Sequence, residues 1–268
     1  VGEKALLRER RIAVIIPAYN EEARLAGVVS GLQSWVDLRI VINDGSDDAT
    51  PEIARSCTDV VLVSHTTRRG VGAAIATGYQ EALHRGADVV AVMAGDGQMR
   101  PDELASLVEP ILRDEVDYIK GNRLAHPDVY SRMPRVRRLG TRALTALTRW
   151  VTGLPSLHDA QCGYTAISRA ALLLLPLSSL YPRYGYPNDL IAMLAAIDAR
   201  IGEVPVTPVY AGERSDLRPA LAVFTHSWVL LRAAWLRRRR VRGVRDAQHL
   251  HRGPSRTKLI AQRPRSSS

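Results

Sequence analysis

Five short runs of apolar, mostly β-branched residues divide the first half of the chain at regular intervals. They read IAVII (12–16), LRIVI (38–42), DVVLVS (59–64), ADVVAVM (87–93) and VDYIKG (116–121). Helical patterns at 21–35, 50–56, 70–86 and 101–114 separate them. Continuously apolar strands joined by helices are typical of βαβ units, whose mainly parallel sheet is covered by helices on both faces. The sequence therefore predicts an α/β fold.

The second half of the chain alternates less regularly. Its patterns predict helices at 134–152 and 187–199, strands at 162–168 and 201–209, and a last helix from about 218 to 240. A chain of 268 residues suffices for one large domain with a buried core. We expect this domain to occupy 1–236, and the polar, Ser-, Pro- and Arg-rich segment 237–268 to be disordered.

The positive charge of the chain belongs to its end. The net charge is +10, yet 237–268 holds 11 Lys and Arg against the single acid Asp246, so 1–236 is neutral. This distribution argues against a nucleic-acid-binding domain, and binding of nucleic acid by the arginine-rich tail is kept as a remote alternative. The sequence has two isolated cysteines and shows no signal peptide. It also has no uninterrupted run of about 18–20 apolar residues, so we expect a cytoplasmic protein.

Acids, amides and glycines follow the predicted strands. In an open parallel sheet, ligands bind beyond the carboxyl ends of the strands, so these segments are the candidate site. They are PAYNEE (17–22), NDGSDD (43–48), GDGQ (95–98) and GNR (121–123). The first turn lacks the G-x-G-x-x-G of a dinucleotide site. Gly70 and Gly72 open a helix, where close packing is favoured over anion binding.

The order of these segments carries a resemblance. Over roughly 11–215 the chain resembles the family-2 glycosyltransferases, and in particular the polyprenyl- and dolichyl-phosphate sugar synthases. The segments that carry the resemblance are, in order, IIPAYNEE, INDGSDDAT, RGVGAAIATG, GDGQ, GNR and DAQCGYTAIS. The resemblance implies a GT-A fold, a nucleotide-diphosphate sugar donor, a divalent metal and inversion at the anomeric carbon. It divides the domain into a nucleotide-binding half (11–123) and an acceptor half (124–236).

For the donor, the resemblance assigns the metal to Asp96 and the Gln98 side-chain oxygen, with Mg²⁺ or Mn²⁺ stabilising charge on the departing diphosphate. Gly95 would let the donor approach the backbone. The family usually has an acid at the position of Ala94, so this chain departs from the pattern there. An Asp-Gly turn without a ligand is the alternative for Asp96.

Nucleotide recognition is assigned to two further strand ends. Asp44 matches an acid that contacts the base or ribose of a UDP- or GDP-sugar, and the loop with Pro17, Ala18, Tyr19 and Glu21 matches the nucleotide pocket. A plain turn is the alternative for Asp44. A helix start favoured by the helix dipole is the alternative for Glu21.

Two kinds of acceptor remain open. A polyprenyl phosphate is already an anion and needs cations, for which Arg123, Arg137, Thr141 and Arg214 match family positions. A small-molecule hydroxyl, as in natural-product assembly, needs a carboxylate base, for which Asp159 or Asp189 could serve. Arg137 could also be a solvated helix arginine, and Asp189 a helix cap. The phosphate acceptor is preferred.

The predicted last helix carries an apolar stripe. Its members are Leu217, Leu221, Phe224, Trp228, Leu231 and Trp235, and an arginine cluster follows at 237–242. Such a helix suits the surface of an anionic membrane, so 217–242 predicts a peripheral position on the cytoplasmic membrane face. A C-terminal helix packed on the core is the alternative.

Overall fold

The computed structural model describes residues 10–209. Several predicted features lie outside the described residues. They are Arg214, the helix at 218–240, the predicted membrane segment 217–242 and the tail 237–268. The domain boundary at 236 therefore remains a prediction.

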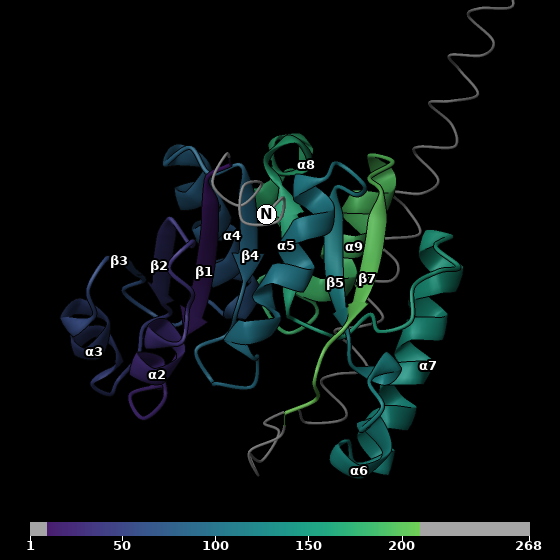
Figure 1. The fold of residues 1–268 in the computed structure, drawn as a ribbon, viewed down its shortest axis with the longest axis horizontal. Coiled ribbons are helices and arrows are strands. Elements are labelled where there is room, and N and C mark those ends of the chain that lie inside the picture. Colours follow the sequence, from purple (N-terminus) through teal and green to yellow (C-terminus); the bar gives the residue numbers. More distant parts are fainter. Residues whose placement is uncertain (1–9, 210–268) are drawn as a thin grey trace, which may run out of the picture.

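One seven-stranded sheet runs through the described residues, in the order β3-β2-β1-β4-β6-β5-β7 (Figure 1). Its strands are β1 (Ile12–Ala18), β2 (Leu38–Asn43), β3 (Val60–Ser64), β4 (Val89–Val92), β5 (Tyr118–Asn122), β6 (Thr165–Ser168) and β7 (Ile201–Pro205). β6 runs antiparallel to both of its neighbours, and the other strand pairs are parallel. The predicted mainly parallel α/β sheet is confirmed.

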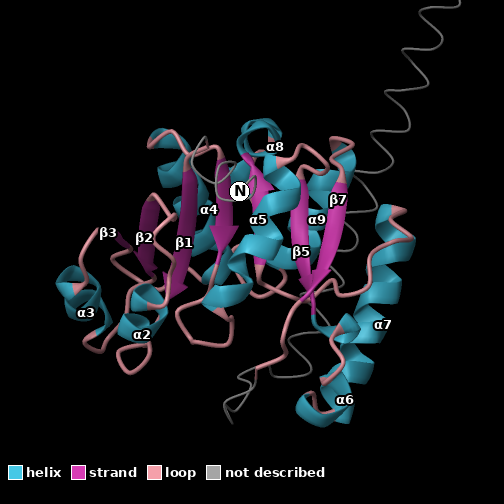
Figure 2. Ribbon diagram, in the orientation of Figure 1, coloured by secondary structure: helices cyan, strands magenta, loops and turns pink. Residues whose placement is uncertain are grey.

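Helices cover both faces of the sheet (Figure 2). They are α2 (Leu25–Ser30), α3 (Thr50–Ser56), α4 (Val71–His84), α5 (Leu104–Leu112), α6 (Val129–Arg132), α7 (Arg135–Thr152), α8 (Arg169–Leu174) and α9 (Tyr186–Ala196). β1 shows why both faces need cover. Val14 and Ile16 pack with α2 and α5, whereas Ile15 packs with α4 and α9 on the opposite face. Alternate side chains of a strand point to opposite faces, so an all-apolar strand is buried on both.

The helix predicted at 21–35 is wrong in its extent, because α2 begins only at Leu25 and ends at Ser30. The residues before it are held by the turn that follows β2. The backbone N–H of Asn20 donates to Ser46 Oγ at 3.0 Å, and that of Glu21 to Thr50 Oγ1 at 2.8 Å. These bonds give the amides partners outside a helix and leave residues 20–24 as a loop.

The carboxyl ends of β1, β2, β4 and β5 meet at one edge of the sheet, at the lower side of Figure 1. α6 and the first turns of α7 lie at the same end of the molecule. α8 lies at the opposite end. The predicted site segments are thereby gathered from four separate parts of the sequence.

Candidate functional site

The donor-side segments are in direct contact at this edge. The Gly95 N–H donates to the Pro17 carbonyl at 3.1 Å, and the Asp44 N–H to the Ala18 carbonyl at 2.9 Å. A Cβ on Gly95 would lie only 3.2 Å from the Ala18 Cβ, so a small residue lets the two loops close on each other. The structure thus brings together the predicted nucleotide loop and the metal loop.

Asp96 and Gln98 form a tight turn directly after β4. The Gln98 N–H donates to Asp96 Oδ1 at 2.9 Å, and Gly97 has a φ of +71°. Among residues 10–209, no group of three His, Cys, Asp or Glu side chains could hold a metal alone. One carboxylate and one amide oxygen nevertheless fit Mg²⁺ or Mn²⁺, which also take ligands from substrate phosphates and water. The assignment of the metal to these residues stays a prediction.

Tyr19 and Glu21 belong to the predicted nucleotide loop at 17–22. The Arg68 guanidinium lies over the Tyr19 ring, 3.9 Å from its centre. Glu21 pairs with Arg24 at 3.2 Å. The cation–π contact joins the segment after β3 to the predicted nucleotide loop.

Asp44 is buried, with 3% of its surface exposed, and its carboxylate anchors the segment after β3. It accepts hydrogen bonds from Arg69 N at 2.9 Å, Gly70 N at 2.7 Å and His65 Nδ1 at 2.7 Å. His65 Nε2 lies 3.0 Å from Thr77 Oγ1 on α4. The geometry therefore gives Asp44 a positioning contact with the 65–70 loop, in addition to the nucleotide contact predicted for it.

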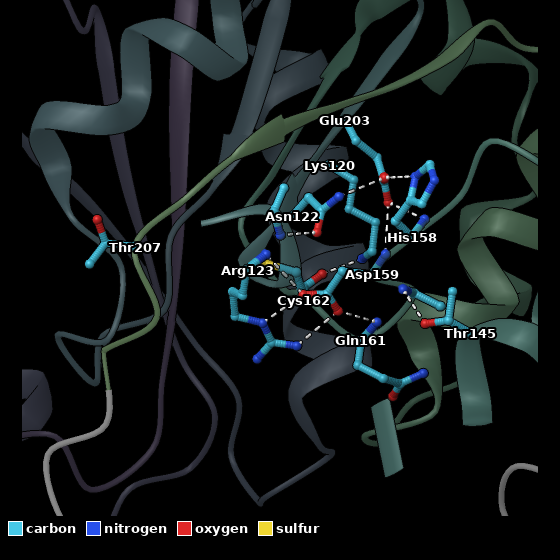
Figure 3. Close-up of polar contacts among 12 residues, drawn as sticks. Lys120, Asn122, Arg123, Thr145, His158, Asp159, Gln161, Cys162, Glu203 and Thr207 are labelled. Carbon is cyan, nitrogen blue, oxygen red and sulfur yellow. Dashed lines mark hydrogen bonds and ion pairs between the residues drawn. The ribbon is translucent and has the colours of Figure 1, made fainter. Parts of the chain in front are cut away.

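Arg123 and Asp159, assigned to separate roles from the sequence, form a bidentate ion pair (Figure 3). Arg123 Nε donates to Asp159 Oδ2 at 2.8 Å and Nη2 to Oδ1 at 3.0 Å. Burial alone would raise the pKa of Asp159, but the charges of Arg123 and Lys120 and the bonds from Arg123 hold it below its usual value. A fully buried carboxylate with a lowered pKa is a weak base.

Asp189 is also fully buried, in the first turn of α9. Its Oδ2 accepts the Tyr181 N–H at 2.8 Å. The next residue of that loop, Pro182, accepts the Ala73 N–H of α4 at 3.1 Å. A Cβ on Gly72 would overlap the Tyr181 carbonyl, so the glycines that open α4 permit close packing, as preferred from the sequence.

α7 carries two of the predicted acceptor residues on different surfaces. Thr141 is buried, whereas Arg137 is exposed. Four of the five buried residues of α7 are threonines, and the fifth is Val151. Thr145 Oγ1 accepts the Ala160 N–H at 3.0 Å, and Thr148 Oγ1 lies 3.3 Å from Asn188 Oδ1 of α9.

Sequence reasoning missed the polar hub behind the ion pair. Glu203 of β7 accepts the N–H groups of His158 at 2.8 Å and Asp159 at 2.9 Å, and hydrogen bonds from His158 Nδ1 at 2.9 Å and Asn122 Nδ2 at 3.1 Å (Figure 3). Lys120 of β5 is fully buried beside it. A charged residue in each of two apolar strands was the only signal of this hub in the sequence.

At the strand ends of this sheet, an acid–amide turn lies against the predicted nucleotide loop, at the edge where open α/β sheets bind their ligands. The matches to known proteins place the chain among the nucleotide-sugar-dependent glycosyltransferases. The sequence profile named Glycosyl transferase family 2 matches residues 13–174. The chain belongs to this family. It is 31% identical to the UDP-N-acetylglucosamine–dolichyl-phosphate N-acetylglucosaminyltransferase of Methanococcus voltae, over 76% of this chain and 88% of the relative.

Two further comparisons agree. The polyprenol monophosphomannose synthase of Mycolicibacterium smegmatis is 31% identical, over 74% of this chain and 77% of its own. The crystal structure of glucosyl-3-phosphoglycerate synthase from Mycobacterium tuberculosis with UDP superimposes with a TM-score of 0.67 at 25% identity, covering 87% of this chain and 83% of that one. These matches confirm the GT-A fold and the glycosyltransferase activity expected from the sequence.

Proposed function

We propose that this glycosyltransferase moves a sugar, with inversion, from a UDP- or GDP-sugar to the phosphate of a polyprenyl phosphate. One observation carries the acceptor class. Relatives 31% identical over about three quarters of the chain are named for dolichyl-phosphate and polyprenol substrates. The neighbour with UDP supports the nucleotide donor, and further structures of that enzyme hold Mn²⁺ or Mg²⁺.

Residues at different strand ends would bind different parts of the donor. Pro17, Ala18 and Gly95 would line the donor site. Asp96 and Gln98 would hold Mg²⁺ or Mn²⁺, which supplies positive charge to the departing diphosphate. Each of these roles remains a proposal.

The acceptor side supports a phosphate over a hydroxyl. A phosphate nucleophile is an anion at neutral pH and needs a cation nearby, which Arg123 provides at the end of β5. A hydroxyl would need a base, but Asp159 is paired with Arg123 and Asp189 is fully buried. A water-soluble acceptor is the second candidate, because the neighbour in Mycobacterium tuberculosis is named for 3-phosphoglycerate.

A lipid acceptor requires contact with a membrane, and α7 supports one. No helix between residues 10 and 209 is long and apolar enough to cross a bilayer. The outer face of α7 nevertheless carries an apolar stripe, defined by Val136, Leu139, Ala143, Leu147 and Trp150. Val136 is 86% exposed, Leu139 70% and Trp150 77%.

A row of arginines borders the apolar stripe. Arg135, Arg142 and Arg149 are exposed and recur every seven residues, which places them along one line of the helix. Apolar side chains beside a row of cations suit the surface of an anionic bilayer. We therefore include peripheral membrane contact through α7 in the proposed function. α6 and the start of α7 lie at the site end of the molecule, beside the proposed acceptor side (Figure 1).

The test combines binding with transfer, on the full chain. UDP and GDP are each added with Mn²⁺, Mg²⁺ or EDTA, and the thermal unfolding of wild type, Asp96→Ala and the control Asp102→Ala is measured. A ligand at 100 times its Kd stabilises the folded state by about 2.7 kcal/mol. We expect a metal-dependent shift with one nucleotide that Asp96→Ala loses and Asp102→Ala, an exposed acid paired with Arg100, keeps.

The matching labelled sugar nucleotide is then offered with a polyprenyl phosphate or with 3-phosphoglycerate. Label in the lipid fraction supports the proposal. Label only in the water-soluble acceptor would replace it with the second candidate. Absence of any nucleotide-dependent shift at millimolar ligand would contradict the donor site itself.

A further inference from the structure

A fully buried lysine lies behind the proposed acceptor site. Lys120 is the third residue of β5 and has 0% of its surface exposed. Its Nζ donates to the carbonyl of Cys162, in the loop before β6 (Figure 3). Lysine is among the residues least often buried, because a charge taken out of water must be compensated by partners. Neither the fold nor the proposed donor chemistry requires a charge at this position.

The ionisable groups around Lys120 come from three directions. Arg123 lies at the end of its own strand, and Asp159 and Cys162 belong to the loop before β6. Glu203 of β7 is the residue paired with Lys120 in the strand register. Two carboxylates therefore face two cations in one buried cluster, which we call the β5 charge cluster: Lys120, Arg123, Asp159 and Glu203.

Exposure differs sharply within the β5 charge cluster. The side chains of Lys120 and Asp159 are sealed from solvent, whereas that of Arg123 is 15% exposed. Arg123 alone would be outnumbered by the two carboxylates, and the cluster would repel an incoming anion. The buried ammonium makes the cluster neutral, so the guanidinium at its outer end can present positive potential to a ligand.

We propose that Lys120 is a positioning residue of the acceptor-phosphate site, whose buried charge offsets Glu203 and Asp159 and leaves Arg123 able to hold the acceptor phosphate. This inference rests on the proposed function, because it takes the acceptor to be an anion. It adds to that function a residue outside the predicted set and a specific electrostatic task.

The charge of Lys120 should make acceptor binding depend on pH. Burial lowers the pKa of Lys120. The charges of Asp159 and Glu203 raise it and that of Arg123 lowers it, and the pKa remains below its ordinary value. As pH rises through that lowered pKa, the ammonium loses its proton and the cluster changes from neutral to negative. Binding of a phosphate acceptor should then weaken while binding of the donor does not.

Two other titratable groups lie beside the cluster. Burial raises the pKa of the Cys162 thiol, so it stays neutral to higher pH than a free thiol. His158 contacts the cluster through its hydrogen bond to Glu203. A phosphate monoester, with its second pKa near 6, is a dianion throughout the range above pH 8.

The experiment compares wild type with Lys120→Met, Lys120→Arg, Glu203→Gln and the double variant Lys120→Met/Glu203→Gln, all in the full chain. Met keeps the length of the side chain without its charge. Removing one partner of a buried charge pair is destabilising, whereas the double variant replaces a charge of each sign, so thermal unfolding of every variant is measured alongside binding. Arg200→Met removes a cation at the far end of β5 and β7 and serves as control. Binding of a short-chain prenyl phosphate is measured by calorimetry from pH 7 up to 10.5, the ordinary pKa of lysine, and wild type is compared with Lys120→Met at each pH. KM for acceptor and donor is measured alongside.

At the low end of the pH range, we expect Lys120→Met to bind the prenyl phosphate about tenfold more weakly than wild type and to lose most of the alkaline weakening seen in wild type. Lys120→Arg should stay close to wild type there. The double variant, again charge-balanced, should recover most of the lost affinity, and Glu203→Gln, which leaves the cluster positive, should bind at least as tightly as wild type, which a purely structural role of Lys120 does not predict. Donor KM should change less than about twofold.

Unchanged acceptor affinity in Lys120→Met, or no recovery in the double variant, would overturn the inference. Prenyl phosphate binding that shows the expected pattern without any sugar transfer would count against the proposed function alone. A wild type that does not bind the prenyl phosphate would overturn both.

Discussion

At the scale of single residues, Asp44 is the best test of how the donor site is built. Its buried carboxylate accepts two backbone N–H groups, from Arg69 and Gly70, and one bond from His65. These contacts fix the loop that carries Arg68 over Tyr19. Asp44 therefore anchors the loop that contacts the predicted nucleotide segment at Tyr19.

We expect Asp44→Asn to weaken binding of the metal–nucleotide complex about tenfold or more. An amide nitrogen cannot accept the loop N–H groups, and a hydrogen bond to a charged group contributes about 1.5–3 kcal/mol. Calorimetric titration with the preferred nucleotide and Mn²⁺ measures the affinity. Asp47→Asn, an exposed acid in the same turn, is the control and should bind as wild type does. Equal affinities for both variants would contradict the anchoring role of Asp44.

Residues at strand ends could be predicted from the sequence, but their partners could not. The segments 17–22, 43–48 and 95–98 follow apolar strands, so their convergence follows from the parallel sheet. Arg123 and Asp159 are 36 residues apart, and no periodic signal connects them. Lys120 resembles an exposed strand residue until β7 is placed beside β5, because only then do Glu203 and the 158–162 loop enclose it.

At the scale of elements, strands were predicted better than helices. β1 and β4 are continuous apolar runs because both of their faces are buried, and that pattern is visible in the sequence. α2 is shorter than the helix predicted at 21–35. Residues 20–24 form a loop, in which the amides of Asn20 and Glu21 donate to the side chains of Ser46 and Thr50. The short helices α6 and α8 were missed because four to six residues carry too little periodicity.

α7 is unusual because most of its large apolar residues are exposed, whereas its threonines are buried. Trp150 and Leu139 are 77% and 70% exposed, whereas Thr145 and Thr148 are buried against the 158–162 loop and α9. We expect Leu139→Ser/Trp150→Ser to bind vesicles of phosphatidylserine and phosphatidylcholine roughly 100-fold more weakly or worse, because fully burying each of the two side chains contributes about 1.5–3 kcal/mol. Co-sedimentation over a range of lipid concentrations measures the partition.

The matched control for this surface is Leu173→Ser/Leu174→Ser on α8. Those leucines are 62% and 65% exposed, but α8 lies at the end of the molecule opposite the site (Figure 1). The control should partition as wild type does, and the metal-dependent nucleotide shift should be retained in both double variants. An equal loss in the α8 variant would mean that exposed apolar area in general, and not α7, drives vesicle binding.

At the scale of the whole molecule, the division of charge separates two contributions to membrane contact. Residues 1–236 are neutral in sum, and the net charge of +10 resides in 237–268. The α7 apolar stripe would act through burial, which salt affects little. The basic tail would act through Coulomb attraction, which is screened beyond about 8 Å at physiological ionic strength.

The variant that tests this division changes Arg237, Arg238, Arg239 and Arg240 to Gln in the full chain. Each cation near an anionic bilayer contributes about 1 kcal/mol, so binding to phosphatidylserine-rich vesicles should fall by up to roughly three orders of magnitude at low salt. The dependence of this binding on salt concentration should become weaker, and the nucleotide-dependent thermal shift should be unchanged.

Vesicles of pure phosphatidylcholine are the control, to which the variant should bind as wild type does. The α7 variant should lose binding to both lipids. Identical losses for the two variants on both lipids would show that stripe and tail act as one surface.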